Sequence, residues 1–344
     1  MNFFSKLKRV YLIAEIGVNH NGSLELAKEM IDLAIEAGAD AAKFQTFTAE
    51  GLVTPGTPKV KYQASTTDDA ESHYKMLEKL ELSREYHRIL KKYCDEKKID
   101  FISTPYDEDS VDFLEDLNVE LYKIASADIV DHLLLEKVAR TNKPVILSVG
   151  MATLQEIDQA IDIFKNNDNQ DIILLHCVSN YPCSLESLNL NVLQTLKSRY
   201  NLPIGYSDHS QGHDAAMLSV AFGAKVIEKH FTSDKSLDGP DHKASSDPNE
   251  FRQLVEAIRR GEKILGSEEK ICQDEEFQMS QVSRKSVTLK NNLSRGDVIS
   301  RNDIVMKRPG LKIQAKDIHK ILGKKVYRDL KSNYQIEWND IDNE

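Results

Sequence analysis

The feature that most constrains the fold is a hydrophobic period that keeps switching along residues 11–266. Short β-rich runs alternate with segments of helical spacing, such as SLELAKEMIDLAIEAGA and SREYHRILKKYCDEKK. Short Gly, Pro or Asp turns separate them, which indicates parallel βαβ units. Eight units in roughly 250 residues favour an α/β fold of the (β/α)8 TIM-barrel type over an open doubly wound sheet. The eight runs are YLIAEIGV, AAKFQTF, DFISTPY, ELYKIASAD, PVILSVG, DIILLHCVS, PIGYSDHS and KVIEKHFT.

The pattern changes after residue 266, which divides the chain into three parts. We predict a catalytic barrel over 1–266, an acidic linker over 267–284 and a small β-rich domain over 285–344. Residues 285–341 hold 13 Lys or Arg and 6 Asp or Glu, a net charge of +7 on a chain whose total is −10. A basic domain attached to an acidic barrel is suited to close the binding site of an anionic substrate, either in its own barrel or in a partner's. A merely solvated face explains the charge equally well.

Composition and charge exclude several classes of protein. With 45 basic and 55 acidic residues among 344, the chain is not expected to bind nucleic acid or an anionic membrane. No run approaches the ~20 apolar residues of a membrane helix, and Glu15 interrupts the first apolar run, which rules against a signal sequence. Four cysteines without a CxxC pair fit a reducing compartment. We therefore expect a cytoplasmic protein.

Polar side chains gather near the end of every predicted strand, where a (β/α)8 barrel carries its chemistry. A buried Lys or Glu without a partner is costly, so a purely structural interior would avoid them. Side chains two residues apart share a face of a strand. This predicts four same-face pairs, which are Lys43 with Gln45, Ser126 with Asp128, Ser207 with His209, and Glu228 with His230. The other polar residues near strand ends include Glu15, Asn19, Thr104, Lys123, Ser148, His176, Ser179 and Asp208.

Two lysines and several hydroxyl groups predict a site for a small polyanion. Lys43 and Lys123 belong to the second and fourth strands, so both ammonium groups would stand above the barrel. Hydroxyl donors would come from Thr104, Ser126, Ser148 and Ser207. This combination suits a ligand with two or three negative charges, such as a phosphorylated carboxylate. The long stretch over residues 48–72 follows the second strand and would overhang the mouth.

Two histidines on neighbouring strands predict a divalent metal site. His209 and His230 supply two nitrogens and leave several positions open, which suits Mn²⁺ or Mg²⁺ better than a closed structural zinc site. The alternative is that SDH caps a helix that starts near residue 213, and both interpretations are compatible. Lesser candidates are His20, His176 and His242, while helix surfaces or loops are expected for His73, His87, His132, His213 and His319.

Seven segments together carry a family resemblance: AEIGVNHNGSLELAKEMIDLAIEAGADAAKFQTF, STPYDEDSVDFL, KIASAD, SVGMAT, GYSDHSQG, EKHFTSDKSLDGPDHKAS and KRPG. They resemble the sialic acid synthase family, that is, N-acetylneuraminate synthase and its bacterial relatives making legionaminic or pseudaminic acid. The resemblance covers nearly the whole chain and implies an antifreeze-like (SAF) second domain. It implies condensation of phosphoenolpyruvate with an open-chain N-acetylated hexosamine, giving a nine-carbon 2-keto acid and phosphate. N-acetylmannosamine is the first candidate acceptor, and a diacetamido hexose is the alternative.

The resemblance also implies a role for each site residue. Phosphoenolpyruvate would be held by Lys43, Thr104, Lys123, Ser126, Ser148, Ser179 and Ser207. His209 and His230 would hold a divalent metal, Mn²⁺ before Mg²⁺ or Co²⁺, that polarises the sugar aldehyde. Glu15 would act as a general base or position water. The sugar would contact Gln45, Asp128, Tyr181, Asp241 and, from the partner subunit of a domain-swapped homodimer, Arg308 of KRPG.

The chain departs from the family pattern at three points. Asp128 stands where some members have Glu, Ser179 stands where some have Asn, and RPGLKIQ lacks a second glycine after Pro-Gly. GPDHKAS occurs in sialic and legionaminic acid synthases alike and does not choose between them. Two other functions stay open. A metal-dependent aldolase or hydrolase would not need both lysines, and an ice- or polysaccharide-binding small domain is disfavoured by its charge.

Overall fold

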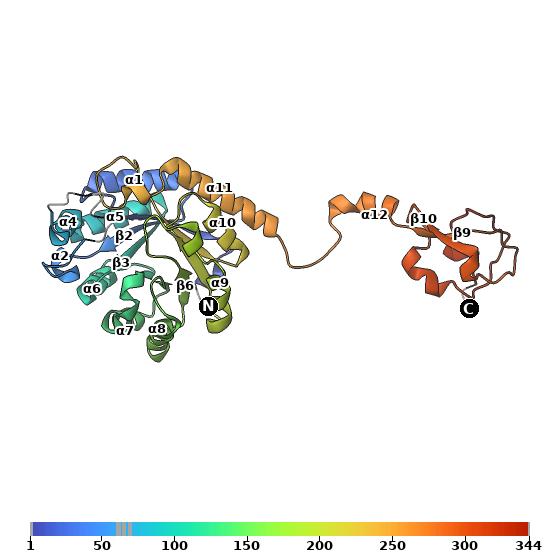
Figure 1. Ribbon diagram of the computed structural model, residues 1–344, viewed down its shortest axis with the longest axis horizontal. Helices are drawn as coiled ribbons and strands as arrows, with labels where there is room; N and C mark the ends of the chain where they lie inside the picture. The colour runs from blue at the N-terminus through green and yellow to red at the C-terminus, as the bar shows by residue number, and fades with distance from the viewer. Residues whose placement is uncertain (1–2, 60–62, 64–66, 68–70, 343–344) are drawn as a thin grey trace. The chain divides into compact units, whose positions relative to one another are not determined.

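The chain consists of two compact units, Met1–Gly266 and Ser267–Glu344. The computed structural model describes residues 3–59, 63, 67 and 71–342. Figure 1 shows the first unit as strands surrounded by helices, and the second as a small unit of strands and short helices. Each unit has a hydrophobic core of its own.

The first unit is a closed parallel barrel. Its hydrogen-bonded strand order is β3-β2-β1-β8-β7-β6-β5-β4, and β3 and β4 at the ends of that order contact each other, which closes the sheet. The predicted (β/α)8 fold is therefore confirmed. The strands are β1 (Tyr11–Gly17), β2 (Ala41–Thr46), β3 (Asp100–Pro105), β4 (Tyr122–Ile124), β5 (Val145–Ser148), β6 (Ile172–His176), β7 (Ile204–Asp208) and β8 (Val226–His230).

The helices of this unit start where the sequence offers caps. Ser23 accepts a hydrogen bond from the backbone N–H of Leu26 at the start of α1, and a capping box joins Thr153 and Glu156 at the start of α8.

Across the described residues, no helix has the length and apolar character to cross a membrane. The helices are α1 (Leu24–Ala37), α2 (Ala49–Leu52), α4 (His73–Leu80), α5 (Arg84–Lys97), α6 (Glu108–Asp116), α7 (His132–Arg140), α8 (Leu154–Asn166), α9 (Val192–Tyr200), α10 (Asp214–Ala221) and α11 (Pro248–Leu265).

The barrel interior is apolar toward the start of its strands and polar toward their ends. An apolar cluster lies inside the barrel, made of Phe4, Tyr11, Ile13, Ala41, Ile102, Leu121, Ile146, Ile173, Leu175 and Val226. A larger cluster fills the layer between strands and helices, and includes Leu12, Phe44 and Tyr206. Burial of this apolar surface stabilises the fold. Buried polar side chains lie closer to the C-terminal strand ends, among them Lys123, Ser148 and Ser207.

Three local predictions are wrong or incomplete. β4 ends at Ile124 and Ser126–Val130 form the 3-10 helix η2, so Ser126 and Asp128 do not share a strand face. His87 is buried in α5 instead of lying on a surface, because Nε2 lies 3.0 Å from Thr46 Oγ1 and Nδ1 3.1 Å from the Ser83 carbonyl. Helix α2 interrupts the stretch 48–72, and residues 60–62, 64–66 and 68–70 of that stretch lie outside the described residues.

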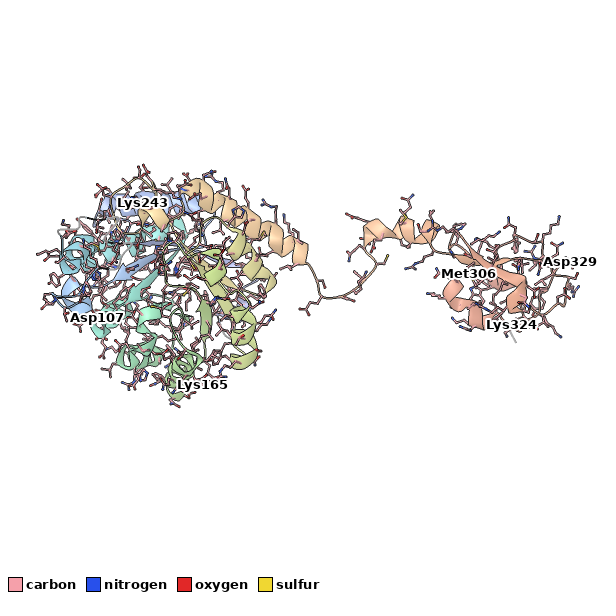
Figure 2. The ribbon with its side chains drawn as sticks, in the orientation of Figure 1. Asp107, Lys165, Lys243, Met306, Lys324 and Asp329 are labelled. Carbon is pink, nitrogen blue, oxygen red and sulfur yellow. The ribbon has the colours of Figure 1, made fainter. Side chains whose placement is uncertain are left out.

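The second unit is a small β-rich domain. Strands β9 (Ser286–Leu289) and β10 (Ile304–Lys307) pair antiparallel. Met306, labelled in Figure 2, packs against the core of this unit. The stretch 267–284, predicted as a linker, contains η5 (Asp274–Glu276) and helix α12 (Phe277–Ser283). The N–H of Gly310 donates to the carbonyl of Gln281 at 2.8 Å, which ties α12 to this unit. Other 3-10 turns are η6 (Arg301–Asp303), η7 (Ala315–Lys320) and η8 (Trp338–Asp340).

Gly205 on β7 leaves no room for a side chain. A Cβ at this position would lie 2.3 Å from Leu175 Cδ2 and 2.5 Å from the Val226 carbonyl oxygen. We expect Gly205→Ala to lower the free energy of unfolding by about 1–3 kcal/mol through overpacking, measured by denaturant unfolding. Gly56→Ala is the control, because nothing lies within 4 Å of its Cβ position. Equal stability of the two variants would contradict this account of the barrel wall.

Candidate active site

A cavity of about 430 Å³ opens among the C-terminal ends of the barrel strands. Asp128 is absent from its lining, and Arg308 lies exposed in the second unit. Every other predicted site residue lines the cavity: Glu15, Lys43, Gln45, Thr104, Lys123, Ser126, Ser148, Ser179, Tyr181, Ser207, His209, His230 and Asp241. Residues from all eight strand ends are thus brought to one place, as barrel closure requires.

A buried charge cluster forms the floor of this cavity. Lys43 Nζ lies 2.6 Å from Glu15 Oε2 and 3.8 Å from Glu228 Oε2. Lys123 Nζ lies 3.6 Å from Glu228 Oε1, which also accepts a hydrogen bond from Ser207 Oγ at 3.1 Å. These four charged side chains are each at most 6% exposed. Their charges balance, which offsets the cost of removing each from water.

The cluster shifts the proton affinities of its members. Burial alone would disfavour the ionised form of Glu228, but Lys123 and Lys43 outweigh it and lower the pKa to about 2. Burial acts against the charge on Lys43 as well, yet Glu15 and Glu228 together raise its pKa. Burial lowers the pKa of Lys123, and Glu228 offsets this in part. Burial raises the pKa of Glu15 despite the ion pair with Lys43. Glu15 therefore holds a proton more readily than an ordinary carboxylate.

Hydroxyl and thiol groups surround Gly150 at the end of β5. Ser126 Oγ accepts a hydrogen bond from the Gly150 N–H at 3.0 Å and lies 3.1 Å from Cys177 Sγ. A Cβ on Gly150 would come within 2.7 Å of Ser179 Oγ, so a larger residue here would displace these groups. Ser148 Oγ is buried and makes no hydrogen bond within the described residues. The wall therefore offers donors close to Lys123, as a phosphate or carboxylate requires.

His209 and His230 face each other at the cavity edge. Their ring centroids are 5.7 Å apart. His209 Nδ1 lies 2.7 Å from the Val178 carbonyl, which can only accept, so the proton sits on Nδ1 and Nε2 presents a lone pair. Burial lowers the pKa of both imidazoles, and His209 and Lys43 lower that of His230 further. His230 Nδ1 is buried without a hydrogen-bond partner in the described part of the chain.

The histidine pair suits an open metal site. Metal ligation needs neutral imidazoles with available lone pairs, and the pair has both. Among the described residues, no three His, Cys, Asp or Glu side chains are arranged to hold a metal ion. A site with two protein nitrogens leaves its other coordination positions to substrate and water. Such an open site is typical of a catalytic divalent ion, whereas a structural ion is held by a closed set of protein ligands. A weak acidic neighbour is Asp241, whose Oδ2 is 3.9 Å from His230 Nδ1.

The remaining wall is aromatic and polar. The Tyr181 ring lies 4.2 Å from the His209 ring, centroid to centroid, and 5.4 Å from that of His230. Gln45 Nε2 donates to Glu15 Oε1 at 3.0 Å. Gln45 therefore lies beside the charge cluster, on the same face of β2 as Lys43, as the alternation of side chains predicts. Asp128 lies instead on η2, where burial and the nearby Asp131 raise its pKa to about 7. Its sugar contact, which the family resemblance implies, stays a prediction.

The comparisons with known proteins identify the family of the chain. Residues 30–270 match the NeuB family, and residues 284–342 match the SAF domain. The chain belongs to the NeuB family. It is 44% identical to the N,N'-diacetyllegionaminic acid synthase of Legionella pneumophila over 96% of this chain and 94% of that protein. It is 35% identical to human N-acetylneuraminate-9-phosphate synthase over 97% and 93% of the two chains.

A solved relative supports the same assignment. The crystal structure of N-acetylneuraminic acid synthetase from Leptospira borgpetersenii matches with a TM-score of 0.71 and 40% identity, covering 79% of this chain and 90% of that one. The resemblance inferred from the seven segments is therefore confirmed, and the second unit carries a SAF domain. These relatives are named as synthases of the sialic and legionaminic acid type.

Several residues of this NeuB-family site had no predicted role. Glu228 was placed on a strand face with His230, but its position between two lysines depends on strands that are distant in sequence. His73 was expected on a helix surface or in a loop, and it lines the cavity from the start of α4. The other histidine candidates are held elsewhere: Gly22 N–H donates to His20, the Leu188 carbonyl contacts His176 and Thr232 contacts His242. Apolar contributors to the wall are Val18, Leu52, Val53, Met76, Leu77 and Leu80.

Glu228→Gln should destabilise the barrel strongly while keeping the shape of the side chain. The change leaves the buried Lys123 ammonium without its ion pair, so we expect the free energy of unfolding to fall by about 3–5 kcal/mol. Denaturant unfolding without ligands measures this. Glu186→Gln on the exposed turn η3 (Leu185–Ser187) is the control, with an expected change within about 0.5 kcal/mol. Similar losses in the two variants would disprove the charge balance described above.

Proposed function

We propose that the protein condenses phosphoenolpyruvate with an open-chain N-acetylated hexosamine. The proposal depends on one observation, that two buried lysines and two facing imidazoles line the same cavity. C3 of phosphoenolpyruvate bonds to the aldehyde carbon, whose oxygen takes up a proton. Water adds to C2, and the bond from C2 to the phosphate oxygen breaks. The products are a nine-carbon 2-keto sugar acid and inorganic phosphate.

Phosphoenolpyruvate would occupy the charged end of the cavity. Its phosphate and carboxylate would pair with Lys43 and Lys123, which requires them to replace part of the pairing with Glu228. The hydroxyl groups near Gly150 would supply further hydrogen bonds, and Ser148 Oγ is available for this because no described residue bonds it. The remaining proposed contacts come from Thr104, Ser126, Ser179 and Ser207.

The acceptor sugar would lie between the charge cluster and the histidines. A divalent ion held by His209 and His230, Mn²⁺ before Mg²⁺ or Co²⁺, would supply Lewis acidity to the aldehyde oxygen. Glu15, with its raised pKa, would take the proton released by the attacking water. Gln45, Tyr181 and Asp241 line the part of the cavity proposed for the sugar.

The identity of the acceptor is the finer part of the proposal. By sequence, N-acetylmannosamine comes first and a diacetamido hexose second. The 44% identity to a diacetyllegionaminic acid synthase, against 35% to the human N-acetylneuraminate-9-phosphate synthase, favours the diacetamido hexose. The aldolase and sugar-binding alternatives require no lysine pair, which makes them poorer accounts of the charge cluster.

Incubation with phosphoenolpyruvate, Mn²⁺ and a panel of sugars tests the proposal. We expect phosphate release with the diacetamido precursors to exceed that with N-acetylmannosamine by about tenfold, and none with mannose, because a site built for an acetamido group rejects sugars that lack it. His209→Ala is the matched control and should keep its circular dichroism spectrum while losing metal-dependent turnover. Phosphate release that is independent of any acceptor, or full turnover by His209→Ala, would refute the proposed reaction.

We also propose a domain-swapped homodimer in which Arg308 completes the partner's site. Arg308 is exposed and follows β10 in the second unit, whose net charge suits an anionic substrate. A guanidinium from another subunit would bind the N-acetylated end of the sugar. Residues 267–284 would then carry the SAF unit from one barrel toward the other.

A mixed dimer distinguishes action across subunits from action within one. Arg308→Ala and His209→Ala homodimers should both be nearly inactive. A heterodimer of the two, purified with two affinity tags, contains one barrel with intact histidines that receives Arg308 from the other chain. We expect about half of the wild-type activity per dimer, since one of two sites is complete. An inactive heterodimer would show instead that Arg308 serves its own barrel.

A further inference from the structure

A second charged pair is buried in the wall beside the histidines. Asp208 at the end of β7 lies opposite Lys229 on β8 in the strand register. Lys229 Nζ is 2.7 Å from Asp208 Oδ2, and the two side chains are 4% and 0% exposed. Each is the immediate neighbour of a cavity histidine, His209 or His230. Because side chains alternate along a strand, Asp208 and Lys229 point away from the cavity, and neither lines it.

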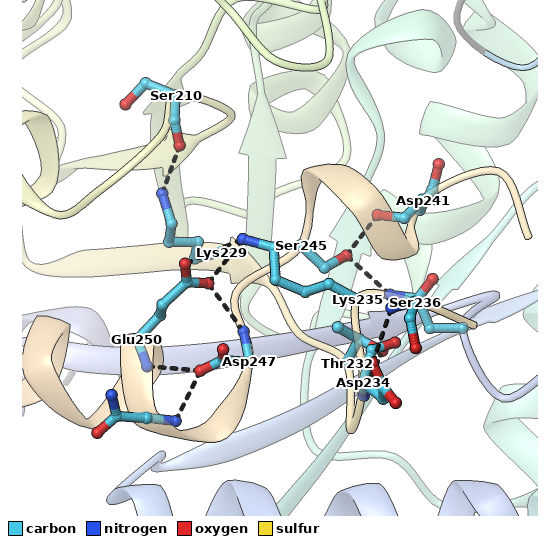
Figure 3. A network of polar contacts seen from close by, with 12 residues as sticks. Ser210, Lys229, Thr232, Asp234, Lys235, Ser236, Asp241, Ser245, Asp247 and Glu250 are labelled. Atoms are coloured by element: carbon cyan, nitrogen blue, oxygen red, sulfur yellow. Dashed lines mark hydrogen bonds and ion pairs between the residues drawn. The ribbon is translucent and has the colours of Figure 1, made fainter. Parts of the chain in front are cut away.

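The pair also holds the turn that leaves β7. Lys229 Nζ donates a second hydrogen bond to the Ser210 carbonyl at 2.8 Å, drawn as a dashed line in Figure 3. Asp208 Oδ1 accepts from the Ser210 N–H at 2.9 Å and from Ser210 Oγ at 2.7 Å. Residues 208–210 are thereby fixed to β8 on both sides of His209.

Other contacts orient each histidine, and the Tyr181 ring lies against both imidazoles. The His209 ring is fixed by the Val178 carbonyl and its own carbonyl accepts from Cys183 N–H at 2.9 Å. The His230 carbonyl accepts from Ser246 N–H at 2.8 Å. The β7–β8 register ends at the Asp208–Lys229 pair. Beyond the last register pair, the ion pair links the two strands on the wall side, while Ser207 Oγ donates to Glu228 Oε1 at 3.1 Å on the cavity side.

Stability alone gives a weak reason for such a pair. Taking two charges out of water costs about as much as their attraction returns, and an apolar pair of similar volume is often equally stable. What an ion pair with several hydrogen bonds provides is a fixed geometry. For metal sites, the groups that hold the ligands in place tune affinity as well as orientation.

We propose that the Asp208–Lys229 pair is a positioning device that sets the separation of the two cavity imidazoles, and with it the affinity for a divalent cation. This inference depends on the proposed function, because that function makes His209 and His230 the metal ligands. Neither Asp208 nor Lys229 touches the substrates. Their effect is exerted through the backbone on either side of the histidines.

The test compares Mn²⁺ binding by full-length variants without substrates, measured by isothermal titration calorimetry. Asp208→Leu combined with Lys229→Met removes both charges, so no buried charge is left unpaired. We expect its melting temperature to stay within a few degrees of the wild type, and its Kd for Mn²⁺ to rise by about 10- to 100-fold. Excess Mn²⁺ should restore its kcat, which loss of fold would not allow.

The matched control is an ion pair at the other end of the same barrel. Arg259 Nη2 lies 3.2 Å from Asp40 Oδ2, next to the start of β2. Asp40→Asn combined with Arg259→Met should leave the Kd for Mn²⁺ unchanged whatever it does to the melting temperature. If the first double variant does not fold, Asp208→Asn combined with Lys229→Gln removes both charges with polar side chains and should weaken Mn²⁺ binding by about tenfold.

The outcomes separate this inference from the proposed function. Wild-type Mn²⁺ affinity in the Leu–Met double variant, or in Asp208→Asn with Lys229→Gln if that is the variant used, overturns the positioning role alone. An equal loss of affinity in the Asp40–Arg259 control also overturns it, because the effect would then be general destabilisation. Failure of the wild type to bind Mn²⁺, or undiminished binding by His209→Ala, overturns the metal assignment and the inference together.

Discussion

Lys43 stands between two buried carboxylates, and the polar half of the barrel depends on that arrangement. Its Nζ is 2.6 Å from Glu15 and 3.8 Å from Glu228, while Lys123 approaches Glu228 from β4. Ionised groups removed from water are tolerated only when each has a close partner of opposite charge. No single strand can provide that balance. Closure of β1, β2, β4 and β8 around one axis is what brings the four groups together, so fold and site require each other.

The charge cluster also determines how a ligand can enter. An anion that pairs with both lysines must compete with Glu228, whose lowered pKa keeps it ionised at neutral pH. Binding therefore exchanges one set of ion pairs for another inside a cavity of low polarity. Such an exchange favours a ligand with two anionic groups over one with a single charge, because a monoanion replaces Glu228 at one lysine only. The site is thus selective before any hydroxyl group contributes.

Hydrophobic periodicity predicts the frame of this site but not its contacts. All eight strands were predicted, and the alternation rule holds on β2, β7 and β8, where Gln45, His209 and His230 line the cavity. The rule fails after Ile124, because turn hydrogen bonds start η2 and Asp128 no longer belongs to a strand. His87 was misplaced since its polar partners, Thr46 and Ser83, are invisible to a helical pattern. The pairing of Glu228 with Lys123 joins strands that are not neighbours in the sheet, which no local pattern encodes.

The two ends of the cavity are built from different kinds of structure. The charged end comes from strands, whose positions are fixed by the barrel ladder. The other end is closed partly by α4 and residues near α2, where Val18, Phe47, Met76, Leu77 and Leu80 pack in a separate apolar cluster. Side chains of loops and short helices can change without disturbing a barrel. Under the proposed function, the chemical step would depend mainly on the strands, and the choice of sugar would depend partly on the segments around them.

Register connects these features, because one alternation on β7 and β8 serves two purposes. It directs His209 and His230 into the cavity and the Asp208–Lys229 pair into the wall. A slip of one residue would exchange the two sets, placing an ion pair in the mouth and imidazoles among the apolar side chains. Both errors are costly, the first because substrate chemistry is lost and the second because polar rings would be buried without partners. The correct register is therefore favoured by folding energetics and by the needs of the site at the same time.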